Sequence, residues 1–182
     1  MIDLRSDTVT LPTLEMIDAI NSVKLGDDVY IEDSSTNTLE QLAAKIMGKE
    51  SALLVSSGTM GNLIASLVHS PRGTEAIMGH KSHTFIYESG GISSYGGIHS
   101  HQLYNHEDGT IDLNLIKDAI RTDDVHFPRT SLIILENTHN KCHGFPLALA
   151  YIKSVCSLAH NNNIKVHMDG ARVFNACTAL GL

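Results

Sequence analysis

The sequence predicts an α/β protein, a three-layer sandwich in which helices cover both faces of a mostly parallel sheet. Helical and strand-like patterns alternate along the 182 residues, as they must where crossover helices join parallel strands. The run at 131–135 is apolar without polar alternation, which is typical of a strand buried on both faces, and a further strand is expected at 164–168. Hydrophobic residues make up 42% of the chain and charged residues 18%, so it can bury a core.

The expected helices carry apolar stripes and capping residues. In the range 36–47, apolar residues recur from Leu39 onward at i, i+3, i+4 and i+7. Thr36 can cap the start of this helix, and Gly48 can end it. We expect further helices at 13–23, 62–69, 113–120, 147–160 and from about 172, and further strands at 51–55 and 75–78.

Charge and composition exclude several classes of protein. A formal net charge of −7 with scattered basic residues argues against nucleic-acid binding, which needs clustered Lys and Arg. No apolar run approaches the length of a membrane span, and the first residues lack a secretory pattern, so we expect no membrane association and a cytoplasmic location. The three cysteines show no CxxC spacing, which indicates reduced thiols. The histidines are spread out without an HExxH motif, and no metal is expected.

Polar residues follow the expected strands, where ligands bind in open parallel sheets. The segment 56–62 contains Gly58, Thr59 and Gly61 ahead of a helix, so its free N–H groups could bind a phosphate, although a plain capped turn would look the same. Asp169 follows another strand and could hold a protonated ring nitrogen, and Arg172 could bind a carboxylate or phosphate. The alternative is that Asp169 caps the next helix and pairs with Arg172.

Two histidines and one polar loop are open to either a structural or a chemical interpretation. His83 and His126 lie in polar stretches and could stack on an aromatic cofactor or act as an acid or base, or could be structural. The segment 136–140 could line a pocket or only satisfy its own backbone. Cys142 lies beside His143, but no third group is present to orient them, so a thiol nucleophile is not expected.

Five segments in order resemble the threonine aldolase family of fold-type I pyridoxal-phosphate (PLP) enzymes. They are Ile2-Asp3-Leu4-Arg5-Ser6-Asp7-Thr8-Val9-Thr10, Gly26-Asp27-Asp28-Val29-Tyr30, Ser57-Gly58-Thr59-Met60-Gly61-Asn62, Leu135-Glu136-Asn137-Thr138-His139-Asn140, and His167-Met168-Asp169-Gly170-Ala171-Arg172 with Phe174-Asn175-Ala176 behind it. The resemblance implies a PLP-dependent transferase-like fold. Residues 1–182 would be the N-terminal segment plus most of the large PLP-binding domain, without the small C-terminal domain.

The resemblance also implies how the cofactor would be bound. Gly58, Thr59 and the backbone of Met60 would bind the phosphate of pyridoxal 5'-phosphate. His83 would stack on the pyridine ring, and Asp169 would pair with the ring nitrogen.

The substrate side follows from the same resemblance. Ser6 and Arg172 would hold the substrate carboxylate, with Arg172 also at the cofactor site. His83 and His126 would lie near the β-hydroxyl of the substrate. Tyr30 would lie in a loop at the site, either in the same subunit or across a subunit interface.

The family reaction is retro-aldol cleavage of L-threonine or L-allo-threonine to glycine and acetaldehyde. It would serve threonine catabolism and glycine biosynthesis, in a dimer or homotetramer. The family's Schiff-base lysine lies downstream of the Asp-Gly-Ala-Arg turn, and the sequence stops at Leu182, so we expect this chain alone to be inactive. The alternatives are an inactive short product that binds a full-length subunit, and another fold-type I β-eliminating lyase.

Two positions depart from the family pattern. Ile31 stands where the family usually has Gly, and Ser34 where it has Pro. If φ is positive at Ile31, the substitution costs on the order of 1 kcal/mol.

Overall fold

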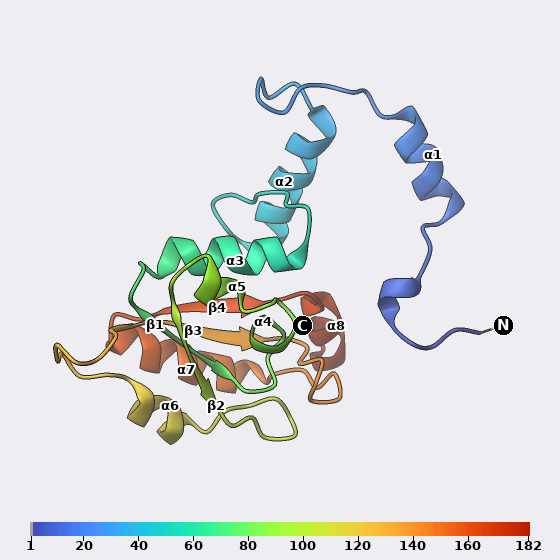
Figure 1. Ribbon diagram of the computed structural model, residues 1–182. Coiled ribbons are helices and arrows are strands. Elements are labelled where there is room, and N and C mark those ends of the chain that lie inside the picture. Colours follow the sequence, from blue (N-terminus) through green and yellow to red (C-terminus); the bar gives the residue numbers. More distant parts are fainter. Residues whose placement is uncertain (1) are drawn as a thin grey trace. The chain divides into compact units, whose positions relative to one another are not determined.

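The computed structural model describes residues 2–182, which form two compact units (Figure 1). The first unit is Met1–Leu54 and the second is Val55–Leu182. The second unit contains the sheet, and each unit is described by itself. None of the helices within residues 2–182 combines the length and apolar composition needed to cross a bilayer.

The second unit is built on a four-stranded sheet in the order β2-β1-β3-β4, with every neighbouring pair parallel. The strands are β1 (Glu75–Gly79), β2 (His99–Leu103), β3 (Thr130–Glu136) and β4 (Lys165–Asp169). All residues of β1 and β3 are buried, which confirms the strand expected at 75–78 and the buried strand expected at 131–135. The edge strand β2 was not predicted, because its polar sequence leaves its side chains partly or fully exposed.

Helices cover both faces of this sheet, as Figure 1 shows. On one face, α3 and α5 pack with Ala76, Met78 and Ile134, and on the other α6 and α7 pack with Ile77 and Ile133. The helices are α3 (Gly58–His69), α4 (His83–Ile86), α5 (Gly91–Ser94), α6 (Leu113–Ala119), α7 (Leu149–Asn161) and α8 (Val173–Leu180). Adjacent strand residues point to opposite faces, so the two apolar clusters share one sheet. The predicted three-layer α/β architecture is confirmed.

The strand expected at 51–55 is absent, and helix α3 begins earlier than predicted. The expected strand at 51–55 has no strand partner among the described residues; its Leu54 N–H instead donates to Glu40 Oε1 at 2.7 Å. A strand needs a neighbouring ladder to pair its backbone, and an apolar run alone does not supply one. Helix α3 begins at Gly58 rather than residue 62, because the Ser57 side chain accepts from Met60 N and caps the earlier start.

The first unit contains short helices joined by turns. They are the 3-10 helix η1 (Asp7–Val9) and the helices α1 (Leu14–Ser22) and α2 (Ser34–Met47). Helix α2 is capped by Asp33, which accepts from two backbone N–H groups, so it starts before the predicted Thr36. Gly48 ends it in the left-handed conformation, as predicted.

A tight turn before α2 contains Ile31, which stands where the threonine aldolase family usually has glycine. The Glu32 N–H donates to the Asp27 carbonyl at 2.9 Å, and the Ile31 N–H donates to the Asp28 carbonyl at 3.0 Å. A Cβ on Gly26 would lie 2.2 Å from the Glu32 carbonyl oxygen, so glycine is required there. Ile31 has a φ of 61°, which strains a β-branched residue.

We expect Ile31→Gly to stabilise this turn by about 1 kcal/mol, because glycine adopts positive φ without a Cβ clash. The Ile31 side chain is 74% exposed, so its removal loses little burial. Hydrogen exchange of the Glu32 amide should slow roughly fivefold. Gly48→Ala, at a φ of 60° with open space around its Cβ, is the matched reverse change and should speed exchange at the end of α2. Equal exchange of Glu32 in Ile31→Gly and the wild type would contradict the strain.

Candidate functional site

Asp169 ends β4, at the edge of the sheet where ligands bind in open parallel folds. It lies beside Glu136 in register, and the Asn137 N–H donates to the Asp169 carbonyl at 2.9 Å. The carboxylate of Asp169 accepts from Ala171 N at 3.2 Å and from Asn62 Nδ2 at 2.9 Å. Asp169 is buried, so its carboxylate is fixed in place.

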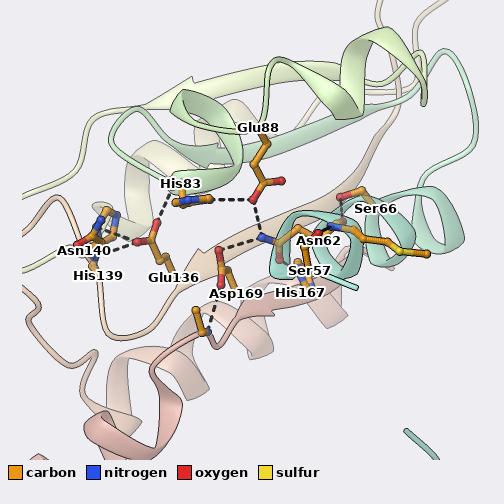
Figure 2. Close-up of polar contacts among 12 residues, drawn as sticks. Ser57, Asn62, Ser66, His83, Glu88, Glu136, His139, Asn140, His167 and Asp169 are labelled. Atoms are coloured by element: carbon orange, nitrogen blue, oxygen red, sulfur yellow. Dashed lines mark hydrogen bonds and ion pairs between the residues drawn. The ribbon is translucent and has the colours of Figure 1, made fainter. Parts of the chain in front are cut away.

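The side chain of Asn62, on α3, joins two buried carboxylates (Figure 2). Its Nδ2 donates to Glu88 Oε1 at 2.8 Å as well as to Asp169. An ionised carboxylate can only accept, so the amide NH₂ must face both. The Asn62 Oδ1 therefore points the other way and accepts from His167 Nε2 at 2.8 Å. Burial lowers the pKa of His167, partly opposed by Asp169, which favours the neutral ring.

His83 begins the short helix α4 and is held at two points. Its backbone N–H donates to Glu136 Oε2 at 2.7 Å, and its ring Nδ1 lies 2.9 Å from Glu88 Oε1. The His83 side chain is 38% exposed, whereas that of Glu88 is 2% exposed. Figure 2 shows the contact that anchors one edge of the ring to Glu88, and the exposed part of the ring is accessible to a ligand.

The imidazole of His83 and the carboxylates of Glu88 and Asp169 form one cluster, whose ligand atoms all lie within 4.8 Å of one another. Such a trio has the composition of a metal site. However, Asn62 directs N–H hydrogens at both carboxylates, and hydrogens between the carboxylates oppose a metal ion there. The cluster suits a ligand with its own N–H group better than a bare cation.

Glu136, at the end of β3, holds the backbone of two site segments through its carboxylate. Its Oε1 accepts from the Asn140 N–H at 2.9 Å while Oε2 holds His83. His139 is buried beside it, with Nδ1 3.9 Å from Glu136 Oε1 and neither ring nitrogen hydrogen-bonded. Burial lowers the pKa of His139, and the Glu136 charge partly offsets this. The segment 136–140 therefore anchors the site rather than only its own loop.

The start of α3 provides a place for an anion. The first N–H groups of a helix have no partner within it, and Met60 N–H here donates to Ser57 Oγ at 3.1 Å. This leaves the amides of Gly58 and Thr59 at the helix end. A Cβ on Gly58 would meet nothing within 4 Å, so the glycine faces open space. That the Met60 backbone binds a phosphate stays a prediction. It would require the Met60 N–H to leave its hydrogen bond with Ser57 Oγ.

The other predicted site residues are His126, Ser6, Tyr30 and Arg172. His126 lies in an exposed loop before β3, with its ring 2.8 Å from Asp124 Oδ1, and so precedes the amino end of the strand rather than following its carboxyl end. Ser6 and Tyr30 belong to the first unit, where Ser6 caps η1 and Tyr30 is exposed. Arg172 is the N-cap residue of α8, close in sequence to Asp169. The substrate roles of these residues stay predictions.

The thiol of Cys142 does not belong to the site. It is buried, its Sγ lies 3.5 Å from the His106 carbonyl oxygen, and burial raises the pKa of this thiol. All three cysteines are unpaired. A raised pKa disfavours the nucleophilic thiolate, in keeping with the interpretation of the sequence.

Sequence analysis assigned no individual role to four of the residues that hold the site together. They are Asn62, Glu88, Glu136 and His167. Three of them fall in the family-like segments, where a role for each could have been sought. Glu88 lies outside those segments, and its buried contact with Asn62 spans 26 residues, which no local pattern indicates.

Several known proteins are similar to this chain. A family model described as β-eliminating lyase matches residues 3–182. The low-specificity L-threonine aldolase 1 of Arabidopsis thaliana is 48% identical over 184 residues, covering 100% of this chain and 51% of the relative. The low specificity L-threonine aldolase of Escherichia coli K12 is 43% identical over 181 residues, covering 100% and 54%.

A solved structure agrees on the fold. The threonine aldolase of Leishmania major superimposes with a TM-score of 0.72 at 22% identity, covering 91% of this chain and 47% of that one. At this identity the likeness shows the fold alone. The chain spans about half the length of the curated relatives it matches.

We expect the second unit to lose stability in mild acid because His139 and His167 are buried with lowered pKa values. Below the ordinary histidine pKa of about 6.5 the unfolded chain binds protons that the folded state refuses, so the free energy of unfolding falls as pH decreases. Each histidine contributes up to about 1.4 kcal/mol per pH unit until its folded pKa is reached.

Denaturant unfolding of the wild type and His139→Leu between neutral pH and about pH 5 measures this slope. In His139→Leu the free energy of unfolding should depend less steeply on pH, because leucine binds no proton and the contribution of His139 is lost. His160→Leu, at the exposed end of α7, is the control and should keep the wild-type slope. Parallel slopes for all three proteins would exclude His139 as a source of acid sensitivity.

Proposed function

Because this chain belongs to the β-eliminating lyase family and aligns over its length with threonine aldolases, we propose that its site serves the PLP-dependent cleavage of L-threonine or L-allo-threonine to glycine and acetaldehyde. The observation that carries the proposal is the buried carboxylate of Asp169, fixed by Asn62 at the end of β4 and beside the half-open ring of His83.

The residues present fit pyridoxal phosphate. The Asp169 carboxylate accepts from two neutral N–H donors, Asn62 Nδ2 and Ala171 N, so it can accept a further, cationic N–H such as a protonated pyridine nitrogen. The open amides of Gly58 and Thr59 suit the phosphate. When bound, this cofactor draws electrons from the substrate carbon beside the amino group.

The chain's own residues would orient the substrate and move one proton. A carboxylate clamp by Arg172 and Ser6 would set the Cα–Cβ bond in the breaking orientation. His83, with one ring edge exposed, would accept the β-hydroxyl proton as acetaldehyde forms. His126 and Tyr30 would complete the substrate side, and we propose a homo-oligomer, a dimer or tetramer, for the full assembly.

A second candidate follows from the family's own description as β-eliminating lyases. Such an enzyme would remove the β-substituent and release ammonia instead of breaking the Cα–Cβ bond. A third candidate is an inactive chain that docks on a full-length subunit. The products formed from threonine separate these candidates.

In a protein that also carries the family's Schiff-base lysine, we expect PLP-dependent release of acetaldehyde and glycine from L-threonine or L-allo-threonine, detected by reduction of the acetaldehyde with alcohol dehydrogenase and NADH. Formation of 2-oxobutyrate and ammonia would favour β-elimination. Borohydride reduction followed by mass spectrometry shows whether the cofactor is attached to a lysine of the chain. Absence of product and of attached cofactor would favour the inactive interaction partner.

Asp169→Asn should reduce cleavage by about 10²-fold or more, because a neutral amide cannot stabilise a charged ring nitrogen. Asparagine keeps an oxygen for the Asn62 donor, so the fold should be retained. Asp118→Asn, on the exposed side of α6, is the matched control and should leave the rate unchanged. Full activity in Asp169→Asn would exclude the ring-nitrogen role.

Gly58→Val should weaken PLP binding at least about tenfold, or ~1.4 kcal/mol, because its side chain would fill the space beside the helix N-terminus. The fold should tolerate this change, since a Cβ there meets nothing within 4 Å. Thr59→Val keeps the side-chain shape and removes only a hydroxyl, so its loss should be smaller. Absorbance titration with PLP measures both, with circular dichroism as the check on folding, and an unchanged affinity in Gly58→Val would place the phosphate elsewhere.

A further inference from the structure

Glu88 is a buried carboxylate that lies between Asn62 and His83. It lies outside the five segments that resemble the family, and its side chain is 2% exposed. A single oxygen, Oε1, receives both Asn62 Nδ2 at 2.8 Å and His83 Nδ1 at 2.9 Å. A buried carboxylate placed so close to a functional histidine is costly unless it is fully hydrogen-bonded, so its partners need an explanation.

The contacts determine which ring nitrogen of His83 carries a hydrogen. An ionised carboxylate has no hydrogen to give, so the short contact to Glu88 requires His83 Nδ1 to donate. The other donor at the same oxygen is the Asn62 NH₂, whose orientation is fixed by Asp169 on its second hydrogen. A neutral imidazole has one N–H, so Nε2 of His83 keeps its lone pair.

We propose that Glu88 is a positioning residue for proton transfer: it holds His83 in the Nδ1–H tautomer, so that Nε2 is ready to accept the β-hydroxyl proton of the substrate. This rests on the proposed function. In that step the substrate O–H bond breaks, an Nε2–H bond forms, and the aldehyde C=O forms as the Cα–Cβ bond breaks. The electron pair of that bond stays on Cα, and the new imidazolium faces the Glu88 carboxylate through Nδ1–H.

Asn62 links the Glu88–His83 pair to Asp169, the residue proposed to bind the cofactor ring. The amide nitrogen that satisfies Glu88 also satisfies Asp169, so one side chain orients the group that would accept a proton and the group that would hold the ring. In turn, Asn62 Oδ1 requires His167 to donate from Nε2. The two histidines are therefore expected in opposite tautomers, His83 with hydrogen on Nδ1 and His167 with hydrogen on Nε2.

Tautomers can be measured without cofactor or substrate. Long-range ¹H–¹⁵N correlation spectra of the ¹⁵N-labelled protein, at a pH above the ordinary histidine titration range, distinguish the protonated from the unprotonated ring nitrogen. We compare the wild type, Glu88→Gln and Glu88→Met. Signals of His83 are identified by their loss in His83→Asn, and the His167 tautomer serves as the internal control for an intact site.

The wild type should show His83 as the Nδ1–H tautomer. Glu88→Gln should keep it, because the glutamine carbonyl can accept from both donors, whereas Glu88→Met offers no acceptor and should shift the ring toward Nε2–H. An Nε2–H ring in the wild type would overturn the proposal even if neither variant folded. An unchanged His83 tautomer in Glu88→Met, with His167 unaltered, would also overturn it.

Cleavage of threonine by the PLP-loaded protein separates this role from a merely structural one. Glu88→Met should lower kcat by about 10²-fold with a small change in KM, and Glu88→Gln should restore part of the loss. Cleavage at the wild-type rate by Glu88→Met would overturn the role of Glu88 alone. Absence of cleavage by the wild type would overturn the proposed function and the proton-transfer role together, while leaving the tautomer measurement valid.

Discussion

The amide of Asn62 is the interaction on which the site depends. Two carboxylates, Glu88 and Asp169, are buried close to each other, where unpaired charge is expensive. One amide nitrogen donates to both, at 2.8 and 2.9 Å. Removing that donor would leave two buried acceptors short of a hydrogen bond, which costs more than the bond itself contributes. The Asp169 carboxylate is held directly by this contact, and the His83 ring is held through Glu88.

Helix α3 brings two functions to the site because of its geometry. Asn62 lies four residues after Gly58, and residues four apart in a helix lie on the same face. The N-terminal amides and the Asn62 side chain are therefore presented from one rigid element, which Ser57 caps. The capped helix therefore holds two groups at a fixed separation. They are the amides that could bind an anion and the Asn62 amide that donates to the two carboxylates.

The parallel sheet supplies the remaining alignment. Strands β1, β3 and β4 end at the same edge, so His83 after β1, Glu136 at the end of β3 and Asp169 at the end of β4 come together. Apolar clusters on both faces hold these strands. The polar network at the edge can include a poorly satisfied group such as His139 because the packed layers beneath it fix the backbone.

The sequence by itself determined the layer architecture, the central strands and the family, because apolar runs, capping residues and glycine-containing turns are local signals. It also placed Asp169 at a strand end and Gly58 at a turn that leads into a helix. Only the tertiary structure decided that 51–55 forms no strand and that Glu88 joins His83 to Asn62. The physical reason is sequence distance: Asn62 and Asp169 are 107 residues apart, and a hydrogen bond between them leaves no trace in the periodicity of either segment.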